Sequence, residues 1–317
     1  MDRLLVVSED VAAALASGGP VVALESTVIA HGLPRPQNLE TAHKMEAAVR
    51  AEGAVPATIG VLGGKLVVGL SPAQITLLAG SEEVAKVSRA DLAAVLASGR
   101  PGATTVASTM FIAARAGIRV LATGGIGGVH HGAEHSFDIS ADLAELARTP
   151  VAVVCAGAKA ILDLRRTLEA LETLGVPVAG YGTSEFPAFY SRESGIPLLH
   201  RVDTPEEAAH LLATQRELGA TGQGTHTGIV IANPPPAETA LSRPEMESLI
   251  AGALEAAKAV GIRGKAVTPF LLEEMVRRSG GRTLKANMAL LIANARLAAQ
   301  IAVAVAKHTS GKPEGQP

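Results

Sequence analysis

Three loops that follow apolar strands carry the side chains in this sequence that could do chemistry. A carboxylate, Glu25, follows the apolar run 21–24, and Lys159 closes the loop after the run 151–155. A glycine-rich loop begins at Thr123, directly after a third such run. Ligands of open α/β sheets gather beyond the carboxyl ends of the strands. These three loops are therefore the first candidates for an active site.

Glu25 and Lys159 have the residue types of a proton donor and a nucleophile. A carboxyl group beside buried aliphatic surface retains its proton to higher pH, so Glu25 could act as an acid near neutrality. Lys159 precedes a helix predicted from Ile161, and the positive end of that helix, together with burial, favours the neutral amine that a Schiff base requires. Each residue also has a structural explanation. Glu25 could hydrogen-bond the backbone of its loop, and Lys159 could extend its charged end to solvent.

The glycine-rich loop, residues 123–130, is suited to binding an anion. Glycines let backbone N–H groups approach a phosphate closely, and a tight bend is the alternative explanation. The loop lacks the spacing of the dinucleotide fingerprint, and neither it nor the segment 63–65 completes a Walker motif. The sequence thus favours one phosphate over a dinucleotide.

The following segment, residues 130–142, is rich in imidazole and carboxylate groups for so weakly charged a chain. Oxygen ligands with some imidazole suit Mg²⁺ or Mn²⁺ better than Zn²⁺, and no thiolate lies near in sequence. We expect Asp138 to be a metal ligand. Ser140 and Asp142 also fit a structural role, because a serine cap and a first-turn acid stabilise a helix N-terminus.

Composition excludes several classes of protein. The 317 residues include 28 basic and 30 acidic side chains, and only 2% are aromatic. A chain without a basic surplus or stacking aromatics is not expected to bind nucleic acid. The single cysteine, Cys155, excludes a disulfide framework and, with the acidic N-terminal residues, predicts a cytoplasmic protein.

Strand and helix patterns alternate along the chain and must position these loops. Short apolar runs predict strands, including a hairpin around Gly63-Gly64, and segments of three- and four-residue apolar periodicity predict helices, one of them capped by Asn38. The alternation predicts a three-layer α/β/α fold around a mixed, largely parallel sheet. We expect one catalytic domain over residues 1–307 and a disordered tail over 308–317.

One apolar segment, residues 286–306, approaches the length of a membrane span. It contains Asn287, Asn294, Arg296 and Gln300, which are costly in a hydrocarbon core. We therefore expect a buried or interface helix, and no membrane association.

Taken together and in order, these segments resemble the pseudouridine-5′-phosphate glycosidase family. The resemblance extends from about Pro20 to Ile301 and rests on ALEST (23–27) with His31-Gly32, ATTVAST (103–109), the block 123–142, VVCAGAK (153–159) and TPFLL (268–272). It implies a homotrimeric α/β/α enzyme that uses Mn²⁺, one ion per subunit, with other divalent ions able to replace it. The implied reaction is reversible cleavage of the C–C glycosidic bond of pseudouridine 5′-phosphate to uracil and ribose 5-phosphate.

The resemblance also implies roles for individual residues. Glu25 would be the proton donor, Lys159 the nucleophile that forms a Schiff base, and Asp138 the metal ligand. The positions that match substrate contacts are Lys86, Val106, Ser140, Ala141 and Asp142. We add as phosphate contacts Thr123, Gly124, Gly125 and His130, and as a uracil contact Asn287.

The sequence departs from the family pattern at three places. His131 stands where arginine is common, Ala293 replaces the first of two adjacent asparagines, and residues 221–227 form a Gly/Thr-rich elaboration. Two other functions fit the same loops: a different Schiff-base lyase of phosphorylated sugars, and a catalytically idle nucleotide-binding module of a secondary-metabolite pathway. Dependence on uracil distinguishes the first of these from the glycosidase.

Overall fold

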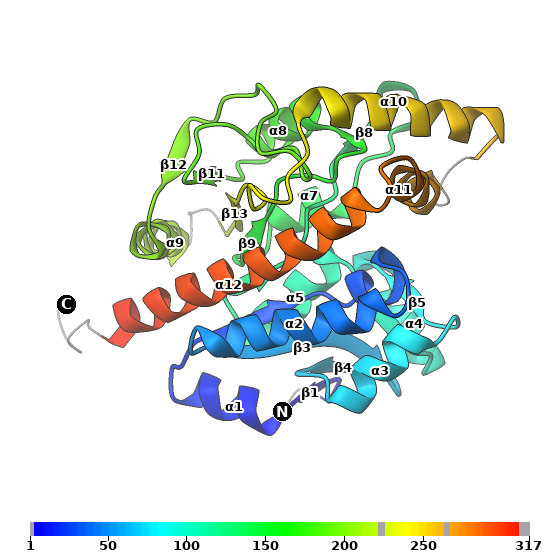
Figure 1. Cartoon of the computed structure of the whole chain (residues 1–317). Helices are drawn as coiled ribbons and strands as arrows, with labels where there is room; N and C mark the ends of the chain where they lie inside the picture. The colour runs from blue at the N-terminus through cyan, green and yellow to red at the C-terminus, as the bar shows by residue number, and fades with distance from the viewer. Residues whose placement is uncertain (1–2, 221–225, 263–266, 311–317) are drawn as a thin grey trace.

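Parallel strands form the centre of one mixed sheet and bring the three loops to the same edge. The computed structural model describes residues 3–220, 226–262 and 267–310. Its eleven-stranded sheet has the order β1-β4-β3-β2-β7-β9-β13-β11-β12, with β6 also paired to β3 and β5 to β6 (Figure 1). This confirms the predicted mixed, largely parallel sheet.

Short apolar runs form the strands, and the longer periodic segments between them form helices. The strands of the sheet are β1 (Leu5–Val7), β2 (Val21–Leu24), β3 (Val55–Leu62), β4 (Lys65–Val68), β5 (Ala85–Val87), β6 (Gly102–Thr104), β7 (Val120–Ala122), β9 (Ala152–Cys155), β11 (Val178–Tyr181), β12 (His200–Val202) and β13 (Ile229–Ala232). A separate ribbon pairs β8 (Val129–His130) with β10 (Leu162–Asp163).

Helices of very different lengths connect the strands. The α-helices are α1 (Glu9–Ala16), α2 (Gln37–Ala51), α3 (Pro72–Gly80), α4 (Leu92–Ser98), α5 (Val106–Ala116), α6 (Ala133–Ser136), α7 (Ala141–Leu146), α8 (Leu164–Thr173), α9 (Pro205–Ala220), α10 (Arg243–Ala259), α11 (Val267–Arg278) and α12 (Arg282–Ser310). A π-helical turn, η1 (Val28–Gly32), follows β2, and a 3-10 turn, η2 (Arg89–Asp91), precedes α4.

The register of the central strands explains why their loops meet. Strands β2, β7, β9 and β13 are parallel neighbours, and Leu24 pairs with Ala122 while Cys155 pairs with Ala232. Every residue of these four strands is buried, as expected where helices cover both faces of a parallel sheet. Residues that directly follow the strands therefore emerge side by side.

Helices on both sides of the sheet complete three layers. In Figure 1 the long helix α12 crosses in front of the sheet, with α2 and α9 against it, and α5 lies behind with α7. The segment 282–308 is apolar and long enough to cross a bilayer, but 56% of its most apolar window is buried within the described protein. The expected buried helix is confirmed.

The hairpin around Gly63-Gly64 is confirmed, but three local predictions are wrong. Asn38 lies inside α2 and its amide donates to the carbonyls of Ile29 and Ala79, so it is no cap. The helix expected from Ile161 begins at Leu164, because residues 162–163 pair with β8 instead. Helix α12 continues to Ser310, past the expected start of the tail at 308. The rest of that tail, 311–317, and residues 221–225 of the predicted elaboration lie outside the described residues.

Candidate active site

Glu25 is a buried acid at the end of β2, with 3% of its surface exposed. The hydroxyl groups of Thr27 and Thr123 donate hydrogen bonds to its two carboxylate oxygens. Burial raises the pKa of Glu25 above the ordinary carboxyl value, although the positive charge of Lys159 and the two hydroxyls act in the opposite direction. The carboxyl group therefore retains its proton to higher pH, as the sequence predicted.

Lys159 lies close enough to Glu25 for its charge to act on that acid. The lysine loop and the glycine-rich loop are joined by three backbone hydrogen bonds of 2.8, 3.1 and 3.0 Å, in which the amides of Ala156, Ile126 and Lys159 donate. The structure thus unites the predicted acid and nucleophile. It does not support the helix-dipole argument for Lys159, because β10 separates this residue from the start of α8.

Asp142 connects the glycine-rich loop to helix α5. The carboxylate is 4% exposed and accepts hydrogen bonds from the amides of Ala107 at 2.9 Å and Gly127 at 2.8 Å. The hydroxyl of Ser140 caps α7 by accepting from the Asp142 amide. These contacts bring Val106, Ser140 and Asp142 next to the glycine-rich loop. Ser140 and Asp142 also have the structural role that their sequence pattern allows, as the cap and the first-turn acid of α7. Their contact with substrate, and that of Ala141, remains a prediction.

Close packing accounts for part of the glycine content of the loop. A Cβ atom on Gly125 would lie 2.6 Å from the Phe189 ring, and one on Gly127 would lie 2.1 Å from the Ser140 hydroxyl. The amides of Ile126 and Gly127 already donate within the protein. The Thr123 hydroxyl donates to Glu25, so in this structure Thr123 orients the acid. The phosphate contacts predicted for Thr123, Gly124 and Gly125 remain predictions.

An irregular segment around Phe189 packs against both catalytic loops. Phe189 is buried in the left-handed region, with φ at 61°, and its amide donates to the Ala156 carbonyl at 3.0 Å. A Cβ atom on Gly157 would lie 2.2 Å from the Pro187 carbonyl. This segment therefore holds the Lys159 loop against the glycine-rich loop. Sequence reasoning missed it, although a pair of aromatic residues is conspicuous in a chain with so few.

The buried Asn294 and the half-buried Asn233 complete the support of Glu25 and were also missed. The Asn233 amide donates to the Asn294 side chain at 2.9 Å, and the Asn294 amide donates to the Thr123 carbonyl at 2.8 Å. Asn233 follows β13, as Glu25, Thr123 and Ala156 follow their strands, and this was the available sequence signal. Of the two adjacent asparagines typical of the family, the first is replaced by Ala293 and the second is Asn294.

The other residues that we predicted to contact the ligand are more exposed than Glu25. Lys86 is exposed on β5, and its charge is a secondary cause, after burial, of the lowered pKa of His31. His130 lies on β8 opposite Leu162, which places it beside the Lys159 loop. Asn287 is half-buried on α12, two turns before Asn294 and on the same face. Their ligand contacts remain predictions.

Asp138 is an exposed carboxylate in the segment between β8 and α7. No group of three or more His, Cys, Asp or Glu side chains arranged for a metal occurs within the described ranges. A Mn²⁺ or Mg²⁺ ion that keeps most of its water needs only one or two protein carboxylates. The donor set therefore fits a largely hydrated ion held by Asp138 and does not fit an ion enclosed by protein ligands.

Replacement of Asn294 by alanine is expected to destabilise the protein. The change leaves the buried Thr123 carbonyl and the Asn233 amide without their partner, which costs about 1–3 kcal/mol of unfolding free energy. Urea denaturation followed by circular dichroism measures it. The control is Asn287→Ala on the same helix, for which we expect a loss of less than about 1 kcal/mol. Equal unfolding curves for the two variants would contradict the role given to Asn294.

Known proteins are similar to this chain over nearly its whole length. The family described as "Indigoidine synthase A like protein" matches residues 10–304. A protein of Methylobacterium nodulans named pseudouridine-5′-phosphate glycosidase is 56% identical over 311 residues, which cover 98% of this chain and 91% of the relative. A protein of the same name from Staphylococcus aureus is 52% identical over 307 residues, which cover 97% of this chain and 98% of the relative.

Two solved structures have the same fold. The prealnumycin C-glycosynthase AlnA, in complex with ribulose 5-phosphate, matches with a TM-score of 0.90 at 43% identity, over 98% of this chain and 100% of its own. An indigoidine synthase A-like protein from Thermotoga maritima matches with a TM-score of 0.85 at 38% identity, over 96% of this chain and 97% of its own. Both similarities therefore cover nearly the whole chain.

Proposed function

The chain belongs to the family of indigoidine synthase A-like proteins, and we propose from this premise that it is a pseudouridine-5′-phosphate glycosidase. The observation that carries the proposal is the proximity of the buried acid Glu25 to Lys159, in a chain 56% identical to a relative of that name. The reaction is reversible: pseudouridine 5′-phosphate and water yield uracil and ribose 5-phosphate. The alternative Schiff-base lyase is not favoured, because the Methylobacterium nodulans and Staphylococcus aureus relatives both carry the name pseudouridine-5′-phosphate glycosidase.

Glu25 supplies the proton that opens the ribose ring. The sugar of pseudouridine is bonded to carbon C5 of uracil, so departure of a protonated nitrogen base is not available. Protonation of the ring oxygen by Glu25 allows the bond between C1′ and that oxygen to break. A carboxyl group whose pKa is raised by burial still carries this proton near neutral pH.

Lys159 forms the covalent intermediate. Its neutral amine adds to C1′ as the ring opens and then loses a proton. Protonation at uracil C5 lets the C1′–C5 bond break with its electron pair on the base, while the lysine nitrogen forms an iminium with C1′. Water adds to the iminium, and the amine leaves to give ribose 5-phosphate and free Lys159.

The phosphate and the base are held by the small polar groups around these two residues. We assign the phosphate to Ser140, Ala141 and the glycine-rich loop, with Lys86 and His130 as the nearby cationic or imidazole side chains. The AlnA complex supports a phosphorylated sugar as the ligand class. Asn287, on the Asn294 face of α12, would contact uracil.

We assign Mn²⁺ as the metal, one ion per subunit, with Asp138 as its protein ligand. When bound, the ion would supply positive charge that organises the polar segment 130–142. The exposed carboxylate of Asp138 supports a site in which water provides most ligands.

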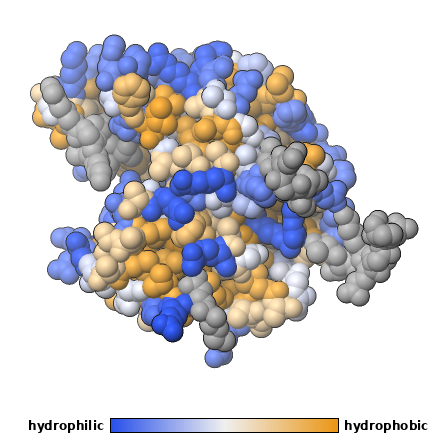
Figure 2. Space-filling model, turned by 180° about the vertical axis from the view of Figure 1, so that it is seen from behind, coloured by the Kyte–Doolittle hydropathy of each residue, from blue (hydrophilic) through white to orange (hydrophobic). Residues whose placement is uncertain are grey.

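We further propose that the enzyme is a cytoplasmic homotrimer. The single buried cysteine supports a reducing compartment. Apolar side chains gather on the face turned away from α12 (Figure 2), and Phe137, with 84% of its surface exposed, stands beside Asp138. Both features support burial of surface between copies of the chain.

The reverse reaction provides the test of function. We expect the protein with Mn²⁺, ribose 5-phosphate and uracil to form pseudouridine 5′-phosphate, detected by liquid chromatography and mass spectrometry. After chelation, formation should fall and should return when Mn²⁺ is added. Sugar-phosphate turnover that does not depend on uracil would instead identify the other Schiff-base lyase, and nucleotide binding without any turnover would identify the idle module.

A further inference from the structure

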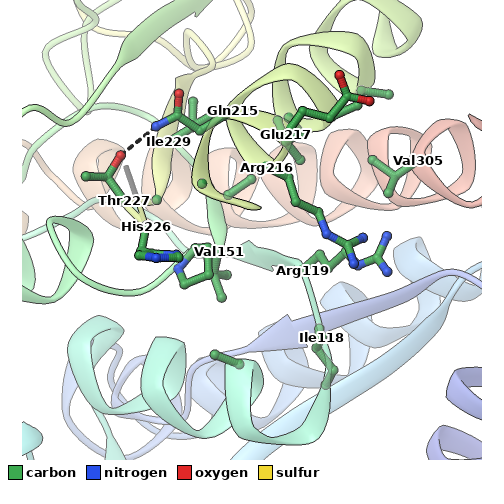
Figure 3. A pocket seen from close by; sticks show the side chains of 18 of the residues that line it. Ile118, Arg119, Val151, Gln215, Arg216, Glu217, His226, Thr227, Ile229 and Val305 are labelled. Carbon is green, nitrogen blue, oxygen red and sulfur yellow. Dashed lines mark hydrogen bonds between the residues drawn. The ribbon is translucent and has the colours of Figure 1, made fainter. Parts of the chain in front are cut away.

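A cavity of about 660 Å³ lies at the edge of the sheet opposite the catalytic loops. It is formed by the amino-terminal ends of β7, β9 and β13, by helix α9 and by the C-terminal part of α12 (Figure 3). Arg119 directly precedes β7 and Thr123 directly follows it, so the two residues are four positions and thus about 13 Å apart. The cavity is therefore separate from the centre around Glu25 and Lys159.

Two arginines converge in this cavity. Figure 3 shows the guanidinium groups of Arg119, which directly precedes β7, and Arg216, on α9, side by side. Burial and the charge of Arg216 both lower the pKa of Arg119. Glu217 is the acid among the described lining residues, and its carboxylate points away from the pair (Figure 3). The cavity thus has a positive end.

The rest of the lining suits the organic, non-phosphate part of a small ligand. Apolar side chains form one wall, and a hydrogen-bonded pair contributes polar groups, since the Gln215 amide donates to the Thr227 hydroxyl at 2.7 Å. His226 also lines the cavity. A volume of 660 Å³ is in the range of small-molecule sites and far exceeds the needs of a bare phosphate ion.

We propose that this cavity is a second ligand site, specific for a small phosphorylated metabolite with an apolar or planar body. Its phosphate lies between Arg119 and Arg216, where two guanidinium groups offer paired N–H donors to anionic oxygens and the anion relieves their mutual repulsion. Its body lies against the wall that includes Leu212 and Val305. This site goes beyond the proposed catalytic function and does not depend on it.

Binding of uridine 5′-monophosphate, measured by isothermal titration calorimetry, tests the proposal. We expect Arg216→Gln to weaken one class of binding sites by about tenfold or more, because a charge-assisted contact is lost. Turnover by the same variant should be unchanged. Arg216 is exposed, so the substitution should not disturb folding, and circular dichroism checks this. Arg119→Gln should weaken the same class of sites.

The matched control is Arg165→Gln, which removes an exposed arginine from α8. It should bind uridine 5′-monophosphate as the unsubstituted protein does. Equal affinities for Arg216→Gln and Arg165→Gln would overturn the site. Inorganic phosphate should bind the same site more weakly than the nucleotide, and equal affinity of the two probes would overturn the part assigned to the apolar wall.

Discussion

Replacement of Lys159 by arginine is expected to lower turnover of pseudouridine 5′-phosphate by about 10⁴-fold or more. Arginine keeps the positive charge beside Glu25, but it is never deprotonated in proteins and cannot form an imine with C1′. The variant therefore distinguishes loss of the nucleophile from loss of the positive charge at position 159. Steady-state rates of uracil release measure the loss.

Trapping with borohydride identifies the bond itself. In the presence of ribose 5-phosphate, the reductant should fix one sugar phosphate on the peptide that contains Lys159, because it converts the iminium into a stable amine. Lys159→Arg should give no adduct. Lys65→Arg serves as the control, since Lys65 is exposed and its amine donates to the Arg3 carbonyl. Rapid turnover by Lys159→Arg would contradict the covalent mechanism.

Replacement of Glu25 by glutamine is expected to lower turnover by about 10²–10⁴-fold, the usual contribution of a general acid. Glutamine has nearly the same shape and can still bond with the Thr27 and Thr123 hydroxyls, but it has no acidic proton. In the unsubstituted enzyme, kcat/KM should fall as pH rises through the raised pKa of Glu25, and this limb should be absent from the residual activity of the variant. Activity measured from pH 5 to pH 9 checks both results.

Although Glu25→Gln should lower turnover, it should not lower the free energy of unfolding at alkaline pH. The pKa of Glu25 is raised in the folded state, so the group favours folding at pH values below its unfolded pKa. That contribution is lost as pH rises through the folded pKa. Glutamine cannot ionise, so Glu25→Gln should match or exceed the unfolding free energy of the unsubstituted protein at alkaline pH. A variant that is less stable at pH 9 would refute the burial argument.

A matched substitution nearby tests whether the loss is specific to the acid. Thr27→Val removes one hydroxyl that donates to Glu25 and leaves the carboxyl group itself. We expect a smaller loss of turnover and a shift of the alkaline limb to higher pH, because the lost hydrogen bond favours the charged form. An unchanged pH profile in Thr27→Val would assign the limb to a group other than Glu25.

The sequence alone predicted the general position of the site because parallel strands share one edge. Glu25, Thr123 and Lys159 follow or closely follow buried apolar runs, and the common register of those runs requires their loops to meet. The buried setting of Glu25 followed from the same pattern. The predicted helix start at Ile161 was wrong because Leu162 pairs with His130. His130 lies far away in sequence, and local periodicity gives no information about such a pairing.

Local sequence therefore determined the layers of the fold, the apolar strands and the residue types at their ends, since these depend on periodicity and on neighbours within a few residues. Only the tertiary structure decided which partners these residues find. Asn294 reaches the Thr123 carbonyl across 171 positions, and Arg119 meets Arg216 at the opposite edge. The physical reason is that such contacts depend on strand register and helix packing, which the whole chain sets together.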